Sequence, residues 1–412
     1  MQPIKYNYTY RLIFIKMELH GFRLYIKTCQ IVLTKEEKMD SNALASKQAS
    51  KRIPQLEGLR FIMCCIIILS HFEFLGDSEI FGDFYKTYLH NPTLAVDYFF
   101  MLSGFGIYLS SKRPESSIKG GLEFAVDKVK KIYPAYIVSL ILGMAWVCLI
   151  TDGLIKTIAK LFIFGITDLT LFQSITGMTM FSHSINGVCW FLSTLFICYI
   201  ACPWLLRVVD KIRNQRQALI MICGLVVITL ALSSGALLIQ NNLSVLNDLW
   251  YGHPFIRCWY LAIGMCIGYL YKVSKTQIGS GQELLIVLIA TAYFFGRNSI
   301  AVDNGVLRVF DILLCIIFLY LFACVSGKLS EVLSTKLMVN LGKISMYLFL
   351  FHYPVRMLIG TVFKNNGWNS EWALLIQVAL IIIITCLITY LYGFVEDSLK
   401  ALQNRFKTTL LG

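Results

Sequence analysis

Apolar residues run along this chain in about eleven long segments, which short polar or charged loops separate. Most segments approach the roughly 18–20 residues that an α-helix needs to cross a bilayer. The pattern therefore predicts an all-α polytopic membrane protein without a soluble catalytic domain. The segments centre on Ile67, Met101, Leu142, Ile163, Phe196, Leu225, Gly264, Leu288, Ile316, Phe349 and Ile382.

The distribution of Lys and Arg indicates which segments cross, because these residues gather in cytoplasmic loops. The basic residues before Leu59 place the start of the chain inside, and the basic run Lys112 to Lys131 returns inside after two helices. The basic run Arg207 to Arg216 falls inside only if the segment near Ile163 does not cross. We therefore expect about ten spanning helices with both termini cytoplasmic, and an interfacial or re-entrant segment over Lys156 to Phe172.

Composition supports a membrane assignment. The chain is 57% hydrophobic and 15% charged, whereas soluble domains are about 45–50% apolar and about 25% charged. The net charge of +13 is explained by membrane topology rather than by nucleic-acid binding, although part of it could serve an anionic substrate. We divide the chain into a basic N-terminal tail (1–53), a transmembrane domain (54–397) and a short cytoplasmic tail (398–412). The N-terminal tail is interpreted as disordered or as a mis-called start.

Metal and nucleotide chemistry find no support in the sequence. Most of the 13 cysteines lie inside apolar runs, where they act as small packing residues. No CxxC pair stands near a second pair or a His pair. Phosphate-binding glycine loops and the hydrolase motifs GxSxG and HExxH are absent in credible contexts. We expect neither a metal site nor nucleotide hydrolysis.

The first apolar segment carries two costly residues, Arg60 and His71. Eleven helical residues make about three turns, so both side chains share one face about 16 Å apart, with the helix expected to end at Leu75. Arg60 alone could snorkel to lipid phosphate, and His71 alone could bond a neighbouring helix. Together they offer a phosphate-binding fork and an acid or base that titrates near neutrality. A long, phosphate-tailed donor with a reactive far end, such as acyl-coenzyme A, fits between them.

The chain resembles the acyltransferase 3 family of integral membrane O-acyltransferases, which decorate cell-envelope glycans. Arg60 and His71, with ten residues between them, match the arginine–histidine motif of that family. Further ordered matches are AVDYFFMLSGFGIYL (95–109), KVKKIYPAY (128–136), GVCWFLSTLFICYIACP (187–203), FIRCWYLAIGMCIGYL (255–270) and LGKISMYLFLFHYPV (341–355). The resemblance implies a cytoplasmic acyl-CoA donor that is not permanently bound, and an acceptor hydroxyl at or beyond the outer face. It gives His71 the essential histidine role and Arg60 the donor-side role.

Donor binding is also assigned to Lys128 and Lys131. They lie at i and i+3, on one face just before the third spanning helix. Membrane topology explains them equally well. Many relatives have arginines in this run, and a lysine binds phosphate as a point charge rather than as a fork.

Four further residues are candidates for the outer part of the site. Asp97 could hold the second nitrogen of His71 as part of the catalytic group, or it could be a helix N-terminal carboxylate. Trp190 and Ser193 could line the acceptor or acyl pocket, although tryptophan is also common at membrane edges. Arg257 lies on the predicted outer side, where topology does not call for a basic residue, so we assign it to acceptor binding.

We therefore predict an O-acyltransferase of the cell (inner) membrane that moves an acyl group, most simply acetyl, from acyl-CoA to a glycan hydroxyl. Capsule, exopolysaccharide, O-antigen and similar glycans all fit as acceptor. The alternative is a transporter or flippase of an anionic or glycan substrate without acyl chemistry, because intramembrane Arg and His also mark substrate paths.

Overall fold

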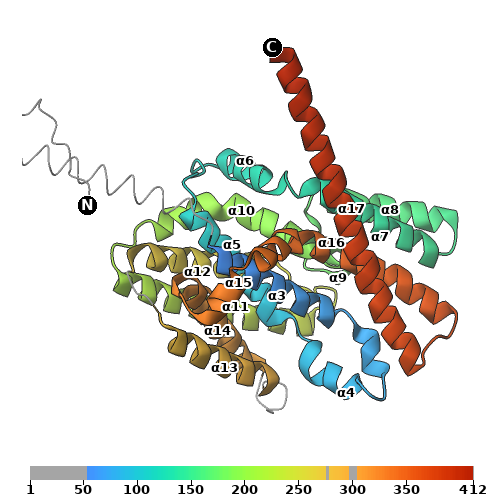
Figure 1. Ribbon diagram of the computed structural model, residues 1–412, viewed down its shortest axis with the longest axis horizontal. Helices are drawn as coiled ribbons and strands as arrows, with labels where there is room; N and C mark the ends of the chain where they lie inside the picture. Colours follow the sequence, from blue (N-terminus) through green and yellow to red (C-terminus); the bar gives the residue numbers. More distant parts are fainter. Residues whose placement is uncertain (1–52, 275–277, 297–303, 412) are drawn as a thin grey trace, which may run out of the picture. The chain divides into compact units, whose positions relative to one another are not determined.

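The computed structural model describes residues 53–274, 278–296 and 304–411 (Figure 1). These residues are helical, and their one β contact is a bridge between Ile278 and Val325. The helices are α3 (Pro54–Ser70), α4 (Gly82–Phe84), α5 (Thr93–Leu109), α6 (Ile118–Val129), α7 (Tyr133–Ile150), α8 (Leu154–Leu169), α9 (Thr179–Ser182), α10 (Trp190–Val209), α11 (Gln215–Asn242), α12 (Pro254–Val273), α13 (Ser280–Gly296), α14 (Asn304–Cys324), α15 (Lys328–Leu333), α16 (Lys336–Asn365) and α17 (Glu371–Leu411), with the short turns η1 (Glu73–Asp77), η2 (Tyr85–Leu89) and η3 (Gln173–Thr176).

The predicted all-α multi-pass fold is confirmed. Six stretches of the described chain are long and apolar enough to cross a membrane: Gly82–Leu109, α7, α10, α11, α16 and Glu371–Ala401 of α17. The other four predicted spans correspond to α3, α12, α13 and α14. The predicted N-terminal tail lies outside the described residues except for Ile53. The predicted C-terminal tail continues α17 as far as Leu411.

The segment expected to be interfacial or re-entrant contains α8, which has sixteen residues and is not among the six candidate spans. The hydroxyls of Tyr133 and Tyr136, in the first turn of α7, donate to the carbonyls of Leu169 and Asp168 at 2.7 Å each. The end of α8 therefore lies beside the start of α7, and the two helices form an antiparallel pair (Figure 1). Whether this segment crosses the membrane stays a prediction.

The centre of the bundle depends on close backbone contact between α5 and α12. A Cβ atom added at Gly104 would lie 1.9 Å from the carbonyl oxygen of Leu261, and one added at Gly264 would lie 1.9 Å from that of Met101. Small residues of this kind let membrane helices approach closely. A third glycine, Gly342, brings α16 equally close to the carbonyl of Glu57 on α3. These crossings fix α3, α5, α12 and α16 around the candidate site.

We predict that Gly264→Ala destabilises the folded protein by about 1–3 kcal/mol, the range for an overpacked core. The neighbouring atom is a backbone carbonyl of α5, which cannot swing aside. The measurement is the midpoint of heat-induced aggregation of the detergent-solubilised protein, followed by size-exclusion chromatography. Gly106→Ala is the matched control, because a Cβ atom there meets nothing within 4 Å. Equal midpoints for the two variants would contradict the tight crossing.

Candidate active site

His71 lies at the end of α3, where it caps the helix after Ser70. The expectation that α3 continues to Leu75 was wrong. At His71 the backbone leaves the helical conformation (φ −90°, ψ 13°), and Glu73–Asp77 forms a short 3₁₀ turn instead. The imidazole therefore stands at the break between a helix and a loop, where it can be reached from the loop side.

Hydrogen bonds fix the tautomer of His71. Its Nδ1 atom lies 2.8 Å from the carbonyl oxygen of Ile67. A carbonyl only accepts hydrogen bonds, so Nδ1 carries the proton and Nε2 keeps a free lone pair. No hydrogen bond within the described part of the chain uses Nε2 of His71. That nitrogen is therefore available as a base.

His352, on α16, is the nearest partner of His71. Its Nδ1 atom donates to the carbonyl of Phe349 at 2.7 Å, which leaves its Nε2 atom as an acceptor 3.4 Å from Nδ1 of His71. The ring of Tyr353 meets His71 edge-on, with centroids 5.4 Å apart. His352 can thus stabilise positive charge on His71 after a proton has been taken up at Nε2.

Sequence reasoning missed this role for His352. The histidine next to Pro354 suggests a side chain that fills the hydrogen bond lost at a helix distortion. The carbonyl that Pro354 cannot bond is that of Leu350, and Asn186 supplies the replacement donor at 3.0 Å. The only feature of the sequence that could have indicated a partner for His71 was this second histidine within an apolar helix.

Arg60, on the same helix as His71, has a half-buried side chain that is 27% exposed and bonds Glu57 at 2.8 Å. One of five guanidinium donors is used in this pair. The ring of Tyr199 contacts Phe124 of α6 at 6.2 Å, and Lys128 Nζ lies 5.1 Å from the Phe124 ring centroid.

Of the predicted donor-side residues, Lys128 is thus placed beside an aromatic pair of α6 and α10. Lys128 is exposed, and partial desolvation beside these rings lowers the pKa of its ammonium group. Lys131 is exposed at the end of the same segment. A phosphate group bound here would meet several cations at one end of α3.

A small apolar cavity of about 10 Å³ lies between the Arg60 and His71 ends of α3. Two of its wall residues, Cys64 and Ile67, follow Arg60 by one and two helical turns on the face that His71 shares. The opposite walls come from α5, α10 and α16. The cavity is about the size of one water molecule, so an acyl chain can pass only when wall side chains rotate. Its lining consists of Cys64, Ile67, Phe99, Phe191, Ser345, Met346 and Phe349.

Asp97 does not contact His71, which was its expected partner. Its carboxylate is fully buried and forms ion pairs with Arg257 at 2.5 Å and with Arg308 at 2.8 Å. This ionic triad joins α5 to α12 and α14. The sequence indicated the depth of Asp97 in the membrane but not the direction in which its side chain points. A structural role is favoured by these contacts, and a catalytic one stays a prediction.

Arg257 is likewise buried rather than open to an acceptor. Besides Asp97, its guanidinium bonds the carbonyl of Tyr251 at 2.5 Å and lies 6.0 Å from the ring of Trp190. Trp190 is 6% exposed and packs against Tyr251 and His183 with centroids 5.2 and 6.4 Å away. The triad thus holds Trp190 at the start of α10, beside His183.

Ser193 has its hydroxyl committed to the chain. It donates to the carbonyl of Leu171 at 2.8 Å and lies 2.8 Å from the hydroxyl of Ser174. Both partners belong to the loop that follows α8, and all of these groups are buried. These bonds support a structural role for Ser193, so its predicted substrate contact remains untested.

The comparison with known protein families agrees with this geometry. The family model described as "Acyltransferase domain", that of the acyltransferase 3 family, matches residues 53–394. The match runs from the start of α3 into the middle of α17, and it includes every candidate site residue. No solved structure matches the chain.

Several curated proteins are similar to this chain over 86% of its length. The "Acyltransferase MdmB" of Streptomyces mycarofaciens is 24% identical and is covered over 93% of its own length. The "Putative peptidoglycan O-acetyltransferase YrhL" of Bacillus subtilis is 24% identical, and the "Putative O-acetyltransferase SACOL0978" of Staphylococcus aureus is 26% identical. The chain spans 56% and 59% of these two longer relatives. With the family model matched across its helical bundle, this chain belongs to the acyltransferase 3 family of membrane O-acyltransferases.

Proposed function

We propose that this enzyme moves an acetyl group from cytoplasmic acetyl-CoA to a hydroxyl of a cell-surface or exported glycan. The arrangement along α3 is the observation that carries this proposal. Arg60 and His71 stand at opposite ends of one helical face, and two residues of that face, Cys64 and Ile67, form one wall of the cavity between them. A donor held by its phosphates at Arg60 can extend its thioester towards His71.

In the proposed reaction the acceptor hydroxyl oxygen attacks the thioester carbonyl carbon while Nε2 of His71 takes the hydroxyl proton. The carbon–sulfur bond then breaks, the new ester leaves with the glycan, and the coenzyme A thiolate takes the proton from His71. Nδ1 of His71 keeps its own proton throughout, held by the Ile67 carbonyl. General-base help of this kind typically contributes about 10²–10⁴ in rate.

Burial of the reacting centre supports a small acyl group. The cavity one helical turn before His71 holds about 10 Å³, and three of its seven lining residues are Phe. An acetyl group needs the smallest rearrangement of these walls. Two of the relatives described above are named as O-acetyltransferases, which agrees with an acetyl donor.

The proposed orientation places Arg60 at the cytoplasmic side and His71 towards the outer side, with both termini in the cytoplasm. Lys and Arg residues of the Lys112–Lys131 run, of α16 before Gly342 and of α17 after Glu396 then share the cytoplasmic side. The donor is available only in the cytoplasm, whereas an exported glycan is reached from the outside. The acyl group therefore crosses the membrane through the protein.

We predict that His71→Ala lowers acetyl transfer by about 10²–10⁴-fold, because no other described side chain occupies the position of its Nε2 atom. The measurement is transfer of radiolabelled acetyl from acetyl-CoA to glycan by the purified protein, with NMR of surface glycans from cells that carry each variant. His90→Ala, an exposed histidine, is the control and should keep full activity. Near-normal acetylation by a folded His71→Ala protein would refute the assignment.

We predict that Arg60→Ala raises KM for acetyl-CoA about tenfold or more, because a hydrogen bond to a charged group contributes about 1.5–3 kcal/mol. Arg60→Lys should recover only part of this affinity, since it keeps the charge but loses the planar fork. Initial rates at varied acetyl-CoA concentration measure the effect. Arg213→Ala, which removes an exposed arginine, should leave KM unchanged. An unaltered KM in Arg60→Ala would remove Arg60 from the donor site.

We predict that Asp97→Ala lowers the heat stability of the solubilised protein sharply, because removing one partner of a buried ion pair costs about 3–5 kcal/mol. Two arginines would then remain buried without their carboxylate. Asp152→Ala, at an exposed position, provides the matched control. The midpoint of heat-induced aggregation, measured by size-exclusion chromatography, decides the question. If Asp97 instead served His71 directly, this midpoint would stay at the wild-type value in Asp97→Ala, and only kcat for acetyl transfer would fall.

A further inference from the structure

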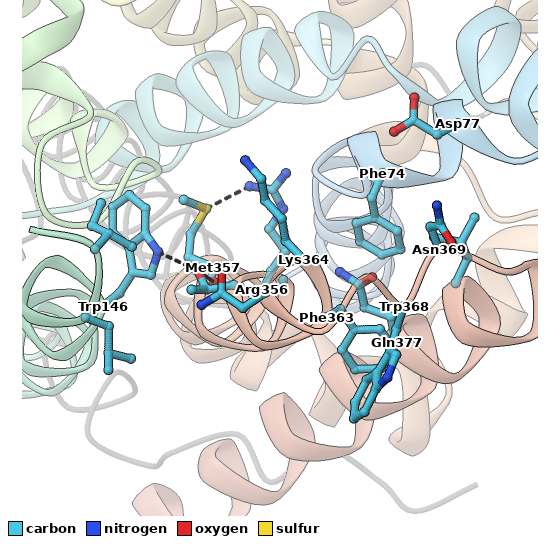
Figure 2. A pocket seen from close by; sticks show the side chains of 16 residues that line it. Phe74, Asp77, Trp146, Arg356, Met357, Phe363, Lys364, Trp368, Asn369 and Gln377 are labelled. Carbon is cyan, nitrogen blue, oxygen red and sulfur yellow. Dashed lines mark hydrogen bonds between the residues drawn. The ribbon is translucent and has the colours of Figure 1, made fainter.

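A large pocket opens at the end of the bundle that contains His71. Its volume is about 1110 Å³, and its walls come from η1, the last turns of α7, the second half of α16 and the start of α17. In the view of Figure 2, Trp146 bounds one side, Phe74 and Asp77 bound the other, and α16 side chains lie between them. None of the residues assigned from the sequence lines this space.

The pocket wall lies one side chain away from His71. Arg356, in the wall, bonds the carboxylate of Glu73, two residues after His71. The guanidinium carbon of Arg356 also lies 5.7 Å from the ring centroid of Tyr353, and that ring contacts His71 at 5.4 Å. A molecule in the pocket that touches Arg356 is therefore placed beside the reacting centre.

The lining combines aromatic rings with planar polar groups. Trp146 donates its ring N–H to Thr361 at 3.1 Å, which orients the indole, and Trp368 packs edge-on against Phe363 at 5.2 Å. Gln377 lines the pocket and is 4% exposed, and its amide forms no hydrogen bond with residues 53–274, 278–296 and 304–411. The amide is therefore free to hydrogen-bond a polar ligand in the pocket.

Lys364 adds a charge that topology does not explain. It lies at the end of α16 opposite Lys336 and Lys343, hence on the proposed outer side, where lysine is disfavoured. No carboxylate of the described chain lies within ion-pair distance of Lys364, whereas Arg356 is paired with Glu73. The pocket therefore offers one unpaired cation to whatever binds there.

We propose that this pocket binds an acidic saccharide of the acceptor, and the inference rests on the proposed function for its role in catalysis. A sugar ring presents an apolar C–H face, which Trp146 and Trp368 can cover, and a rim of hydroxyls, which Gln377 and Asp77 can bond. Lys364 binds the carboxylate or phosphate of the sugar. Arg356 and Tyr353 then keep an adjacent hydroxyl next to His71.

The first test measures binding and does not depend on acyl transfer. Saturation-transfer NMR on the detergent-solubilised protein compares N-acetylmuramic acid, N-acetylglucosamine 6-phosphate and N-acetylglucosamine, which carry a carboxylate, a phosphate and no charge. We expect at least one acidic sugar to bind about tenfold more tightly than the neutral one, and Lys364→Ala to abolish this preference. Lys343→Ala, an exposed lysine at the other end of α16, should preserve it.

Binding of all three sugars with equal affinity, or of none, overturns the proposal. So does a preference that Lys364→Ala leaves intact. A phospholipid that co-purifies with the wild-type protein and is lost from Lys364→Ala, detected by native mass spectrometry, would identify the pocket as a lipid site and also overturn it. The preferred acidic sugar distinguishes a carboxylate from a phosphate ligand.

The second test uses acetyl transfer to the preferred acidic sugar or its oligomer. Lys364→Ala should raise KM for this acceptor about tenfold and leave KM for acetyl-CoA and kcat unchanged. Gln377→Leu, which removes the unpartnered amide, should raise the same KM without altering the donor. If the wild-type protein transfers no acetyl at all, the proposed function fails. If it transfers acetyl and both variants match wild type, only this inference fails.

Discussion

A charged group inside this apolar bundle needs a partner of opposite charge, and that constraint decides how several of the helices are joined. The strongest case is the carboxylate of Asp97, which lies between Arg257 and Arg308 and is fully buried. An isolated charge there would be very costly, so α5, α12 and α14 cannot separate without exposing one. Glu283 plays a comparable part on α13, where it accepts from two backbone N–H groups and the hydroxyl of Ser330 in α15.

Several buried polar atoms of the described chain lack a partner, the hydroxyls of Thr385 and Thr389 among them. The groups that matter for the proposed function are those that can still form hydrogen bonds at the two candidate sites. Nε2 of His71 has no hydrogen bond, although Nδ1 of the same ring has two candidate partners. The amide of Gln377 opens onto the large pocket and forms no hydrogen bond within the described chain. Arg60 uses only one of its guanidinium donors, in its bond to Glu57. Elsewhere in the core the polar side chains are largely tied to backbone carbonyls, as Ser139, Thr194 and Ser193 are.

The sequence predicted the helices and the α3 stripe because both depend on local spacing. An apolar run long enough to cross a bilayer gives a helix, and eleven residues along it return a side chain to the same face. The partners across helices could not be predicted in this way. His352 is 281 residues from His71, and Asp97 is 160 residues from Arg257. The sequence predicted how deep Asp97 lies in the membrane. The direction of its side chain depends on the close contact of α5 with α12 at Gly104 and Gly264.

The end of α3 at Ser70 also escaped prediction, since apolar residues continue through Phe72, Phe74 and Leu75. These side chains join a second, smaller apolar cluster with Tyr85, Val355 and Ile381. The chain therefore leaves the helix without leaving the apolar interior. This break is what lets the imidazole of His71 face a loop rather than the next helical turn.

The narrow cavity along α3 gives the proposed transfer a physical advantage. A cavity of about 10 Å³ has room for about one water molecule, and exclusion of bulk water strengthens the hydrogen bonds around His71. In the proposed reaction the narrow arm of the donor and its acyl group have to pass this constriction, so wall side chains that rotate as the donor enters suffice. A rigid open tunnel would admit water from the donor side and allow the thioester to be hydrolysed before a glycan hydroxyl arrived.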